Sequence, residues 1–214
     1  SLVWVSGFFL FILLMASAFL GYVLPWGQMS YWAATVITKL VSVVPLLGDW
    51  LLSYIWGGYS IGNATLHRFF SLHFIVPFLL LIFSIFHINI LHNPGSSNEF
   101  AFSGGKDSFF HKGTSFFPYY IIKDLFVCSF ILCIYFFFVF FLPDYFNHSD
   151  NYNEVNVLIT PDHIIPEWYF LPFYGMLRSV LDKTFGVIVV GFFFFSCFLF
   201  SFIKSSEPRS FLFS

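Results

Sequence analysis

HFIVPFLLLIFSIFH, residues 73–87, lies inside an uncharged run that extends from Phe69 to Leu91. The only ionisable side chains in this run are the two histidines at the ends of the quoted stretch, His73 and His87. A membrane-spanning helix needs about 20 mostly apolar residues. Strands of membrane barrels alternate polar and apolar residues, and this run does not alternate. The stretch therefore predicts a transmembrane α-helix that carries two histidines.

The composition of the whole chain favours several such helices. Of its 214 residues, 58% are hydrophobic, 9% are charged and 36 are Phe, and the formal net charge is −2. An average soluble domain carries about 25% charged residues. The composition therefore excludes a soluble domain, a disordered tail and a nucleic-acid binder with a clustered basic face. The three cysteines lie in apolar runs, which favours apolar core residues over disulfides or a zinc site.

Three further runs are long and apolar enough to span a membrane: Ser1 to Leu24, Leu125 to Leu142 with an extension back to Tyr119, and Phe185 to Ile203. Because lipid offers the backbone no hydrogen-bond partners, such runs cross it as helices. We therefore predict an all-α protein, a multispanning transmembrane helical bundle with four spans in this chain. The chain starts inside an apolar run without Met and without the basic region of a signal peptide, so we expect it to be partial at its N-terminus.

The connections between the predicted spans differ in character. Pro25 to Leu66 is semi-apolar and contains four Trp, which favours short helices along the membrane interface. Asn93 to Pro118 is polar and rich in Gly and Ser, which predicts a plain loop. Pro143 to Lys183 is the longest polar connection and contains an amphipathic stretch from Asp162 to Arg178.

The chain divides accordingly into three parts. Residues 1–92 contain the first two spans, residues 93–118 the polar loop, and residues 119–214 the last two spans with the long connection. Basic residues gather in the middle loop and the C-terminal tail, and acidic residues in the long connection. The positive-inside tendency then places the middle loop and the C-terminus on the negative side of the membrane.

The two histidines are spaced to share one face of their helix. Fourteen residues separate His73 from His87, which at about 100° each falls about 40° short of four full turns. The rings are then about 21 Å apart along the axis, with Pro77 between them as a possible kink. This spacing suits two cofactors stacked across a membrane, and imidazole is a common axial ligand of haem iron. Hydrogen bonding of both histidines to neighbouring helices is the alternative that spacing leaves open.

The first predicted span carries a matching pair of glycines, Gly7 and Gly21, which are also fourteen residues apart. Glycine inside a helix costs about 1 kcal/mol relative to alanine, so a pair of them needs a reason. Without a side chain, each glycine lets a flat macrocycle or another helix approach the backbone closely. Small-residue packing between helices explains the pair equally well. Together, the two pairs favour two haems in a helical bundle core.

A third set of polar residues lies near the membrane surfaces. Glu167 stands between Pro166 and two aromatic residues. Apolar surroundings disfavour the charged form of a carboxylate, so this residue is a candidate proton acceptor, although a solvent-facing loop carboxylate remains possible. His92 follows the second span, and Lys123 and Asp124 open the third. These side chains either exchange protons with a ligand in the membrane or extend to the interface.

Several motifs, in order along nearly the whole chain, carry a resemblance to one family. They are Gly21-Tyr-Val-Leu-Pro-Trp-Gly-Gln-Met-Ser30, Trp56-Gly-Gly-Tyr-Ser60, Arg68-Phe-Phe70 before His73 and His87, Tyr119 through Asp124, and Pro166-Glu-Trp-Tyr-Phe170 through Arg178-Ser179. With these motifs the chain resembles cytochrome b of the respiratory quinol:cytochrome c oxidoreductase, complex III. The resemblance matches its four spans to the third to sixth helices of that family.

The resemblance implies a role for each matching residue. His73 becomes one axial ligand of the low-potential haem b near the positive side, and His87 one axial ligand of the high-potential haem b near the negative side. Glu167 and Tyr169 become catalytic residues of quinol oxidation, with Glu167 helping to remove a quinol proton. The other implied binding residues are Gly7, Gly21 and Arg68 for the haems, Gly57, Gly58 and Pro166 for the quinol, and His92 and Asp124 for the quinone on the other side.

The implied function is electron transfer from quinol through two haems to quinone, coupled to proton translocation. The implied setting is a multi-pass protein of the mitochondrial inner membrane, with a bacterial plasma membrane as the alternative. Ubiquinol and ubiquinone are the implied substrates. The implied partners are a Rieske iron–sulfur protein, a cytochrome c-type subunit and the other subunits of a dimeric complex III.

The chain lacks the family's helix that supplies the second axial ligand of each haem. A truncated sequence and a naturally split cytochrome b both explain this difference. Two functions of other classes also remain. One is a proton-relay membrane transporter subunit that uses His73, His87 and Glu167, and the other is a structural remnant without redox activity.

Overall fold

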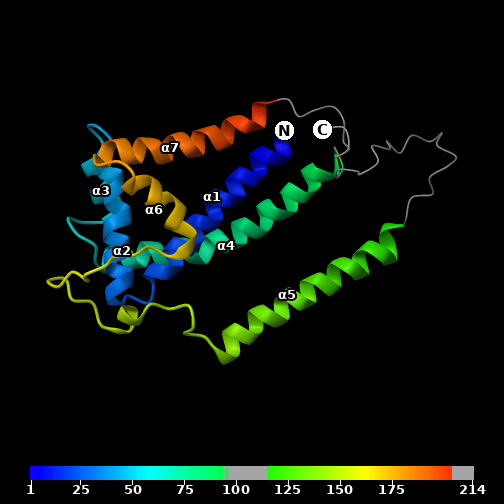
Figure 1. Ribbon diagram of the computed structural model, residues 1–214, viewed down its shortest axis with the longest axis horizontal. Coiled ribbons are helices and arrows are strands. Elements are labelled where there is room, and N and C mark those ends of the chain that lie inside the picture. Colours follow the sequence, from blue (N-terminus) through cyan, green and yellow to red (C-terminus); the bar gives the residue numbers. More distant parts are fainter. Residues whose placement is uncertain (94, 96–114, 204–214) are drawn as a thin grey trace. The chain divides into compact units, whose positions relative to one another are not determined.

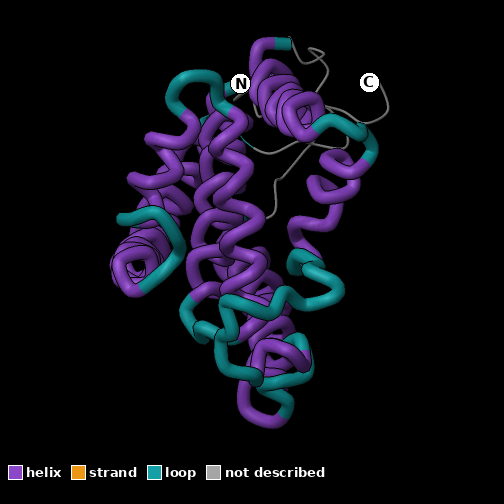
Figure 2. The backbone as a smooth tube through the Cα atoms, turned by 90° about the vertical axis from the view of Figure 1, so that its left-hand side faces the viewer, coloured by secondary structure: helices purple, strands orange, loops and turns teal. Residues whose placement is uncertain are grey.

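The computed structural model describes residues 1–93, 95 and 115–203. Within these ranges the chain forms helices joined by loops and turns, without a strand (Figure 2). Contacts divide the chain into two compact units. Of the described residues, the first unit contains those up to 95 and those from 149 onward, and the second contains 115–148. The three-part division of the sequence at residues 92 and 118 stays a prediction.

The helices follow one another along the chain as labelled in Figure 1. The first unit contains α1 (Leu2–Val23), α2 (Gln28–Lys39), α3 (Gly48–Trp56), α4 (Asn63–His92), α6 (Leu171–Arg178) and α7 (Lys183–Leu199). It also has single turns at Leu40–Val43 (η1), Ser149–Tyr152 (η3), Trp168–Phe170 (η4) and Phe200–Phe202 (η5). The second unit contains α5 (Ile121–Phe141) and the turn before it, Phe116–Tyr120 (η2).

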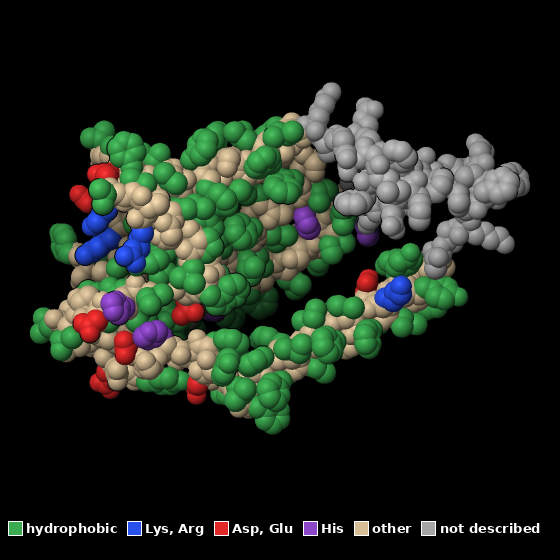
Figure 3. All heavy atoms as spheres, viewed as in Figure 1, with side chains coloured by type: hydrophobic (Ala, Val, Ile, Leu, Met, Phe, Trp, Pro, Cys, Tyr) green, Lys and Arg blue, Asp and Glu red, His purple; other side chains and the backbone are tan. Residues whose placement is uncertain are grey.

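Four helices are long and apolar enough to cross a membrane, which confirms the predicted fold class. They cover Leu2–Val23, Asn63–His92, Phe116–Phe141 and Lys183–Phe202. Few of their side chains are buried within the chain, and large apolar groups cover the surface in Figure 3. In water such a surface would drive aggregation, whereas in a bilayer it meets lipid or other helices. The chain is therefore an integral membrane protein.

The helix that carries the two histidines is longer than the sequence predicted. It begins at Asn63 rather than at Phe69 and continues as one helix through Pro77. Proline is tolerated in membrane helices because neighbouring groups replace the lost hydrogen bond. The two histidines therefore lie on one unbroken helix, as the spacing argument requires.

Inside the first unit, α1 packs along α4, and α7 also contacts α1. Leu20 and Val23 of α1 join Phe69 and Val76 of α4 in the buried core. At the other end of α1, the indole N–H of Trp4 donates a hydrogen bond of 2.7 Å to a main-chain carbonyl of α7. These contacts fix α1 against α4 and α7. They therefore position the polar groups of α1 that face α4.

The connection from α1 to α4 forms two short helices, which confirms the prediction for Pro25 to Leu66. The indole N–H of Trp56, at the end of α3, donates to the Thr38 hydroxyl of α2 at 2.8 Å. The hydroxyl of Thr65 in α4 donates to the Trp56 carbonyl at 2.7 Å. These bonds tie α2 and α3 to the start of α4. The position of the two helices along a membrane interface stays a prediction.

The long connection before α6 is fastened to the start of α2 by buried side chains. The Gln28 amide donates to the carbonyl of Ile159 at 2.5 Å and accepts from the N–H of Asn156 at 2.7 Å. The side-chain oxygen of Asn151 accepts from the N–H of Ser30 at 2.9 Å. These three bonds join segments more than 120 positions apart in the sequence, and they fix the loop that leads to the Pro166 motif.

Only the last part of the amphipathic stretch from Asp162 to Arg178 is helical. The α-helix begins at Leu171, after a single turn that starts at Trp168. Pro166 explains the delay, because the residue before a proline is driven away from helical backbone angles. Asp182 then precedes α7 and accepts hydrogen bonds from the N–H groups of Phe185 and Thr184. These bonds, chiefly that of Phe185, hold the pKa of the Asp182 carboxyl below its ordinary value.

Parts of two sequence predictions lie outside the described residues. They are the plain loop at Asn93 to Pro118, of which residues 94 and 96–114 are not described, and the basic C-terminal tail at 204–214. The membrane side assigned to these segments stays a prediction.

Candidate functional site

The rings of His73 and His87 both lie against α1, each opposite one of the two predicted glycines. A Cβ atom on Gly21 would lie 2.5 Å from Cε1 of His73 and within 3.0 Å of both ring nitrogens. A Cβ atom on Gly7 would lie 3.2 Å from Cε1 of His87. The matched fourteen-residue steps therefore place two rings against two glycines across one antiparallel helix pair. Any larger residue at Gly21 would displace the ring.

Each ring is held through its Nδ1 atom. Nδ1 of His73 lies 2.9 Å from the main-chain carbonyl oxygen of Ser17, and Nδ1 of His87 lies 2.7 Å from Oγ of Ser6. A carbonyl only accepts hydrogen bonds, so His73 carries a proton on Nδ1. In the described part of the chain, neither Nε2 has a hydrogen-bond partner. Nε2 of each ring is thus available to another ligand.

This geometry fits the axial side of a haem. Histidines that bind metals usually donate their other ring N–H to a carbonyl, a carboxylate or a water, which fixes the ring and raises its basicity. His73 has such a carbonyl partner, and His87 has a hydroxyl in its place. Groups of three or more potential metal ligands do not occur among the described residues. The chain therefore offers single imidazoles, the type of ligand that a haem iron takes from each side.

Arg68, predicted to bind a haem, lies on α4 about one turn before His73. Its guanidinium donates to the carbonyl of Tyr54 and stacks on the ring of Tyr54, with 5.6 Å between Cζ and the ring centroid. The side chain is exposed. Arg68 also lies next to Gly57, where a Cβ would be 3.0 Å from Cζ. Its role at a haem stays a prediction.

The Pro166 motif places Glu167 directly before the turn η4 and Tyr169 within it. Both side chains are half-buried, and Trp168 between them is exposed. Burial and, to a smaller degree, the charge of Glu167 raise the pKa of Tyr169 to about 12. Tyr169 therefore stays protonated throughout the physiological range.

Tyr22 joins this pair from α1, although no sequence pattern marks it as a site residue. Its hydroxyl is close enough to Glu167 and Tyr169 to interact electrostatically with both. By hydrogen-bond geometry this buried hydroxyl has no partner among the described residues, so we regard the contact with Glu167 as electrostatic. Tyr22 directly follows Gly21, but a tyrosine at the end of an apolar helix is too common to indicate a site.

The two glycines predicted for the same pocket have different surroundings. Gly57 ends α3 with φ of +72°, a left-handed conformation that favours glycine, and its neighbours are Ala64 and Arg68. Gly58 has open space where a Cβ would lie. Their membership of a quinol pocket with Pro166 and Glu167 stays a prediction.

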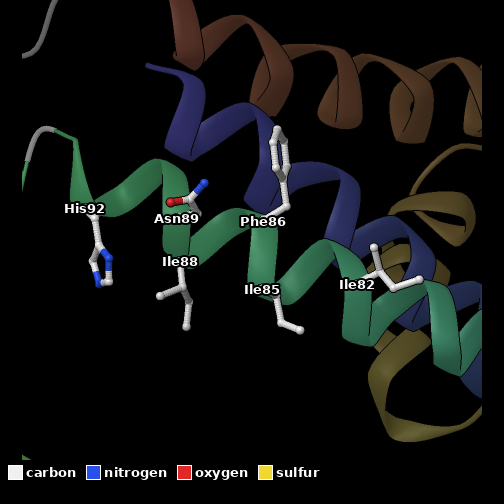
Figure 4. Close-up of a pocket in the computed structure, with 6 residues that line it drawn as sticks. All are labelled: Ile82, Ile85, Phe86, Ile88, Asn89 and His92. Atoms are coloured by element: carbon white, nitrogen blue, oxygen red, sulfur yellow. The ribbon is translucent and has the colours of Figure 1, made fainter.

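On the opposite end of α4, His92 borders a shallow pocket (Figure 4). Ile85, Ile88 and His92 project from one side of the helix, and the remaining lining residues are Ile82, Phe86 and Asn89. The pocket is thus apolar with one imidazole and one amide at its end. Asp124 lies in the first turn of α5, in the other unit. A shared site of His92 and Asp124 stays a prediction.

The arrangement defines a class of protein: a multispanning helical membrane protein with two histidines suited to haem ligation on one helix. Comparison with known proteins agrees. The family model "Cytochrome b/b6/petB" matches residues 1–95, and "Cytochrome b(C-terminal)/b6/petD" matches residues 154–214. Together the two models cover more than half of the chain.

Curated relatives and a solved structure point the same way. Cytochrome b of Cyanidium caldarium is 50% identical over 87% of this chain and 47% of its own length. Cytochrome b of Rickettsia conorii is 46% identical over 98% of this chain and 52% of its own. A chain of a hyperthermophilic respiratory complex III superposes with a TM-score of 0.86 at 32% identity, covering 98% of this chain and 56% of that one. The chain belongs to the cytochrome b family, and it spans about half the length of these relatives.

Proposed function

We propose that this chain forms part of the membrane core of a quinol:cytochrome c oxidoreductase, which transfers electrons from quinol through two b-type haems to quinone and couples this to proton translocation. When bound, the haems carry single electrons between the two membrane surfaces. The residues of the chain hold those groups, position the quinones and move protons.

One observation carries the proposal: His73 and His87 each present a free Nε2 from the same side of α4, about 21 Å apart along the helix. In each case the ring lies against a glycine of α1 and is fixed through Nδ1. Hydrogen bonding to the neighbouring helix accounts for Nδ1 of each ring, but it leaves both Nε2 atoms without a partner among the described residues. The repeated arrangement supports two equivalent ligand sites.

Quinol oxidation is assigned to the cluster of Glu167, Tyr169 and Tyr22. The carboxylate of Glu167 accepts a proton from the quinol hydroxyl, and the protonated phenol of Tyr169 beside it stabilises the carboxylate before that transfer. Pro166 keeps the residue before it out of a helix, and Glu167 lies directly before the turn η4. Gly57 and Gly58 complete the pocket in this proposal.

Quinone reduction is assigned to the opposite end of α4. The pocket beside His92 combines an apolar wall with an imidazole and the Asn89 amide (Figure 4). These groups suit a quinone ring, which is flat and apolar and has two carbonyl acceptors. His92 and Asp124 deliver the protons that the reduced quinone takes up.

The proposed partners are a Rieske iron–sulfur protein, a cytochrome c-type subunit and the remaining helices of cytochrome b, within a dimeric complex. The proposed setting is the mitochondrial inner membrane, and the proposed substrate pair is ubiquinol and ubiquinone. The relatives in Rickettsia conorii and Cyanidium caldarium are both named cytochrome b, which is compatible with this proposal.

The test is a dithionite-reduced minus oxidised spectrum of the complex that contains this chain, with its subunits sequenced. We expect two b-type signals and the loss of one signal in each of the variants His73→Leu and His87→Leu. His67→Leu is the matched control, because His67 is an exposed histidine of the same helix, and it should retain both signals. A complex with this chain but without a b-type signal would contradict the proposal.

A further inference from the structure

Ser6 is a buried residue of α1, directly before Gly7, with an exposed fraction of 8%. Its hydroxyl oxygen has three polar neighbours. The main-chain carbonyl oxygens of Leu2 and Val3 lie 3.0 Å away, and Nδ1 of His87 lies 2.7 Å away. The shortest of these contacts joins α1 to α4.

The chemistry of these neighbours favours one direction for the hydrogen bond between Ser6 and His87. A hydroxyl carries one proton and two lone pairs, and a carbonyl oxygen only accepts. A serine in a helix commonly donates its proton to a carbonyl of its own helix, and Ser6 has two such carbonyls within reach. The hydroxyl then accepts a hydrogen bond from His87, which places the His87 proton on Nδ1 and the lone pair on Nε2.

We propose that Ser6 is a positioning residue that selects this tautomer of His87 and so prepares Nε2 as an axial ligand. The inference rests on the proposed function, since it needs a haem at His87. His73 reaches the same tautomer in another way, because its acceptor is the carbonyl of Ser17. A side-chain substitution removes the acceptor of His87 but leaves that of His73 in place. A single substitution can therefore remove the Nδ1 acceptor of His87 and leave the Nδ1 acceptor of His73 unchanged.

The acceptor also affects the electronic character of the ligand. A hydrogen bond from Nδ1–H raises the basicity of an imidazole ligand, and a more basic ligand stabilises the oxidised iron. Second-shell hydrogen bonding is one of the main controls of haem potential. Ser6→Ala removes the acceptor, so the reduction potential of the His87 haem rises. We expect a change of up to about tenfold in the reduction equilibrium, or about 59 mV for one electron.

The experiment is a redox titration of the two b-type signals, with low-temperature electron paramagnetic resonance of the oxidised haems, on the intact complex. Ser6→Ala should shift one haem to higher potential and change only its resonance. Ser6→Thr should keep the wild-type values, because it retains the hydroxyl. Ser17→Ala is the matched control, because Ser17 is a buried serine of the same helix whose main-chain carbonyl survives the substitution. It should leave the potential of the His87 haem unchanged.

The outcomes separate this inference from the proposed function. Two wild-type haem signals with unchanged values in Ser6→Ala would overturn the role of Ser6 and leave the proposed function intact. The absence of both signals from the wild-type complex would instead overturn the proposed function. If Ser6→Ala fails to assemble, Ser6→Cys provides the test, because a thiol is a weak acceptor. That variant should show a smaller shift of the same haem, and no shift would overturn the inference.

Discussion

Gly21→Ala places a methyl group directly against the ring of His73 and so tests the contact between His73 and α1. The added Cβ would lie 2.5 Å from Cε1 of His73, far inside the 3.4 Å at which ordinary van der Waals contact begins. Both ring nitrogens would also lie within 3.0 Å. The ring must therefore rotate away, and the bond of 2.9 Å to the carbonyl of Ser17 must lengthen or break.

The magnitude follows from three terms. Overpacking of a close contact costs about 1 to 3 kcal/mol, and the lost hydrogen bond about 1 kcal/mol. The better helix propensity of alanine returns about 1 kcal/mol. We expect a net destabilisation of about 1 to 3 kcal/mol at the His73 site, together with a weakened or lost b-type signal of that haem.

Gly7→Ala is the matched comparison. Its Cβ would lie 3.2 Å from Cε1 of His87, a shortfall of a few tenths of an ångström that a small ring movement relieves. The assay is the reduced minus oxidised spectrum and redox titration of both complexes. Gly21→Ala should affect one haem strongly, and Gly7→Ala should affect the other weakly. Equal effects, or a wild-type spectrum in Gly21→Ala, would refute the reasoning from the Cβ distances.

Three further substitutions test other contacts. Gln28→Leu removes the two bonds to Ile159 and Asn156, so we expect a loss of about 1 to 3 kcal/mol and faster proteolysis of the 151–160 loop. Ser179→Ala, at an exposed residue, is the unaffected control. Trp4→Phe removes the bond to α7 and should lower the thermal midpoint by a few degrees, about 1 kcal/mol, whereas Trp50→Phe, on an exposed ring, should not. Glu167→Gln removes the negative charge beside Tyr169 and should lower its pKa from about 12 only part of the way toward 10, because burial remains. The raised pKa of Tyr169 stabilises the fold below pH 10, and this contribution is lost as the pH rises through about 12. Ultraviolet titration of the wild type and of Glu167→Gln, each compared with the same protein carrying Tyr169→Phe, measures the pKa of Tyr169. An unchanged pKa in Glu167→Gln would contradict the assigned charge effect.

The parts of the fold that follow a helical period were predictable from the sequence. The run from Phe69 to Leu91 is uncharged and mostly apolar, which predicts its helix. The common face of His73 and His87 then follows from helix geometry. Gly7 and Gly21 match that period, and the structure places both opposite the rings. The sequence did not predict that each histidine ring itself occupies the space beside its glycine.

Other features depend on contacts between distant segments, and the sequence pattern does not contain them. Gln28 lies more than 120 residues from the loop that it holds, and no local signal marks that pairing. Ser6 and Tyr22 are polar residues in an apolar helix, and only their distance to His87 and Glu167 gives them meaning. The start of α6 was also missed, because the amphipathic period of Asp162 to Arg178 continues through a proline that prevents the helix.

The matched spacing of the two rings and the two glycines limits how these helices can change length in evolution. Deleting one residue between His73 and His87 would turn one ring by about 100° relative to the other and shorten their separation by about 1.5 Å. That ring would then leave its glycine, and no change of a single side chain would return it. Only an equal deletion between Gly7 and Gly21 would restore the register along the axis, and both helices would still have turned. Substitutions between the two histidines or between the two glycines therefore keep this spacing, whereas insertions and deletions there destroy it.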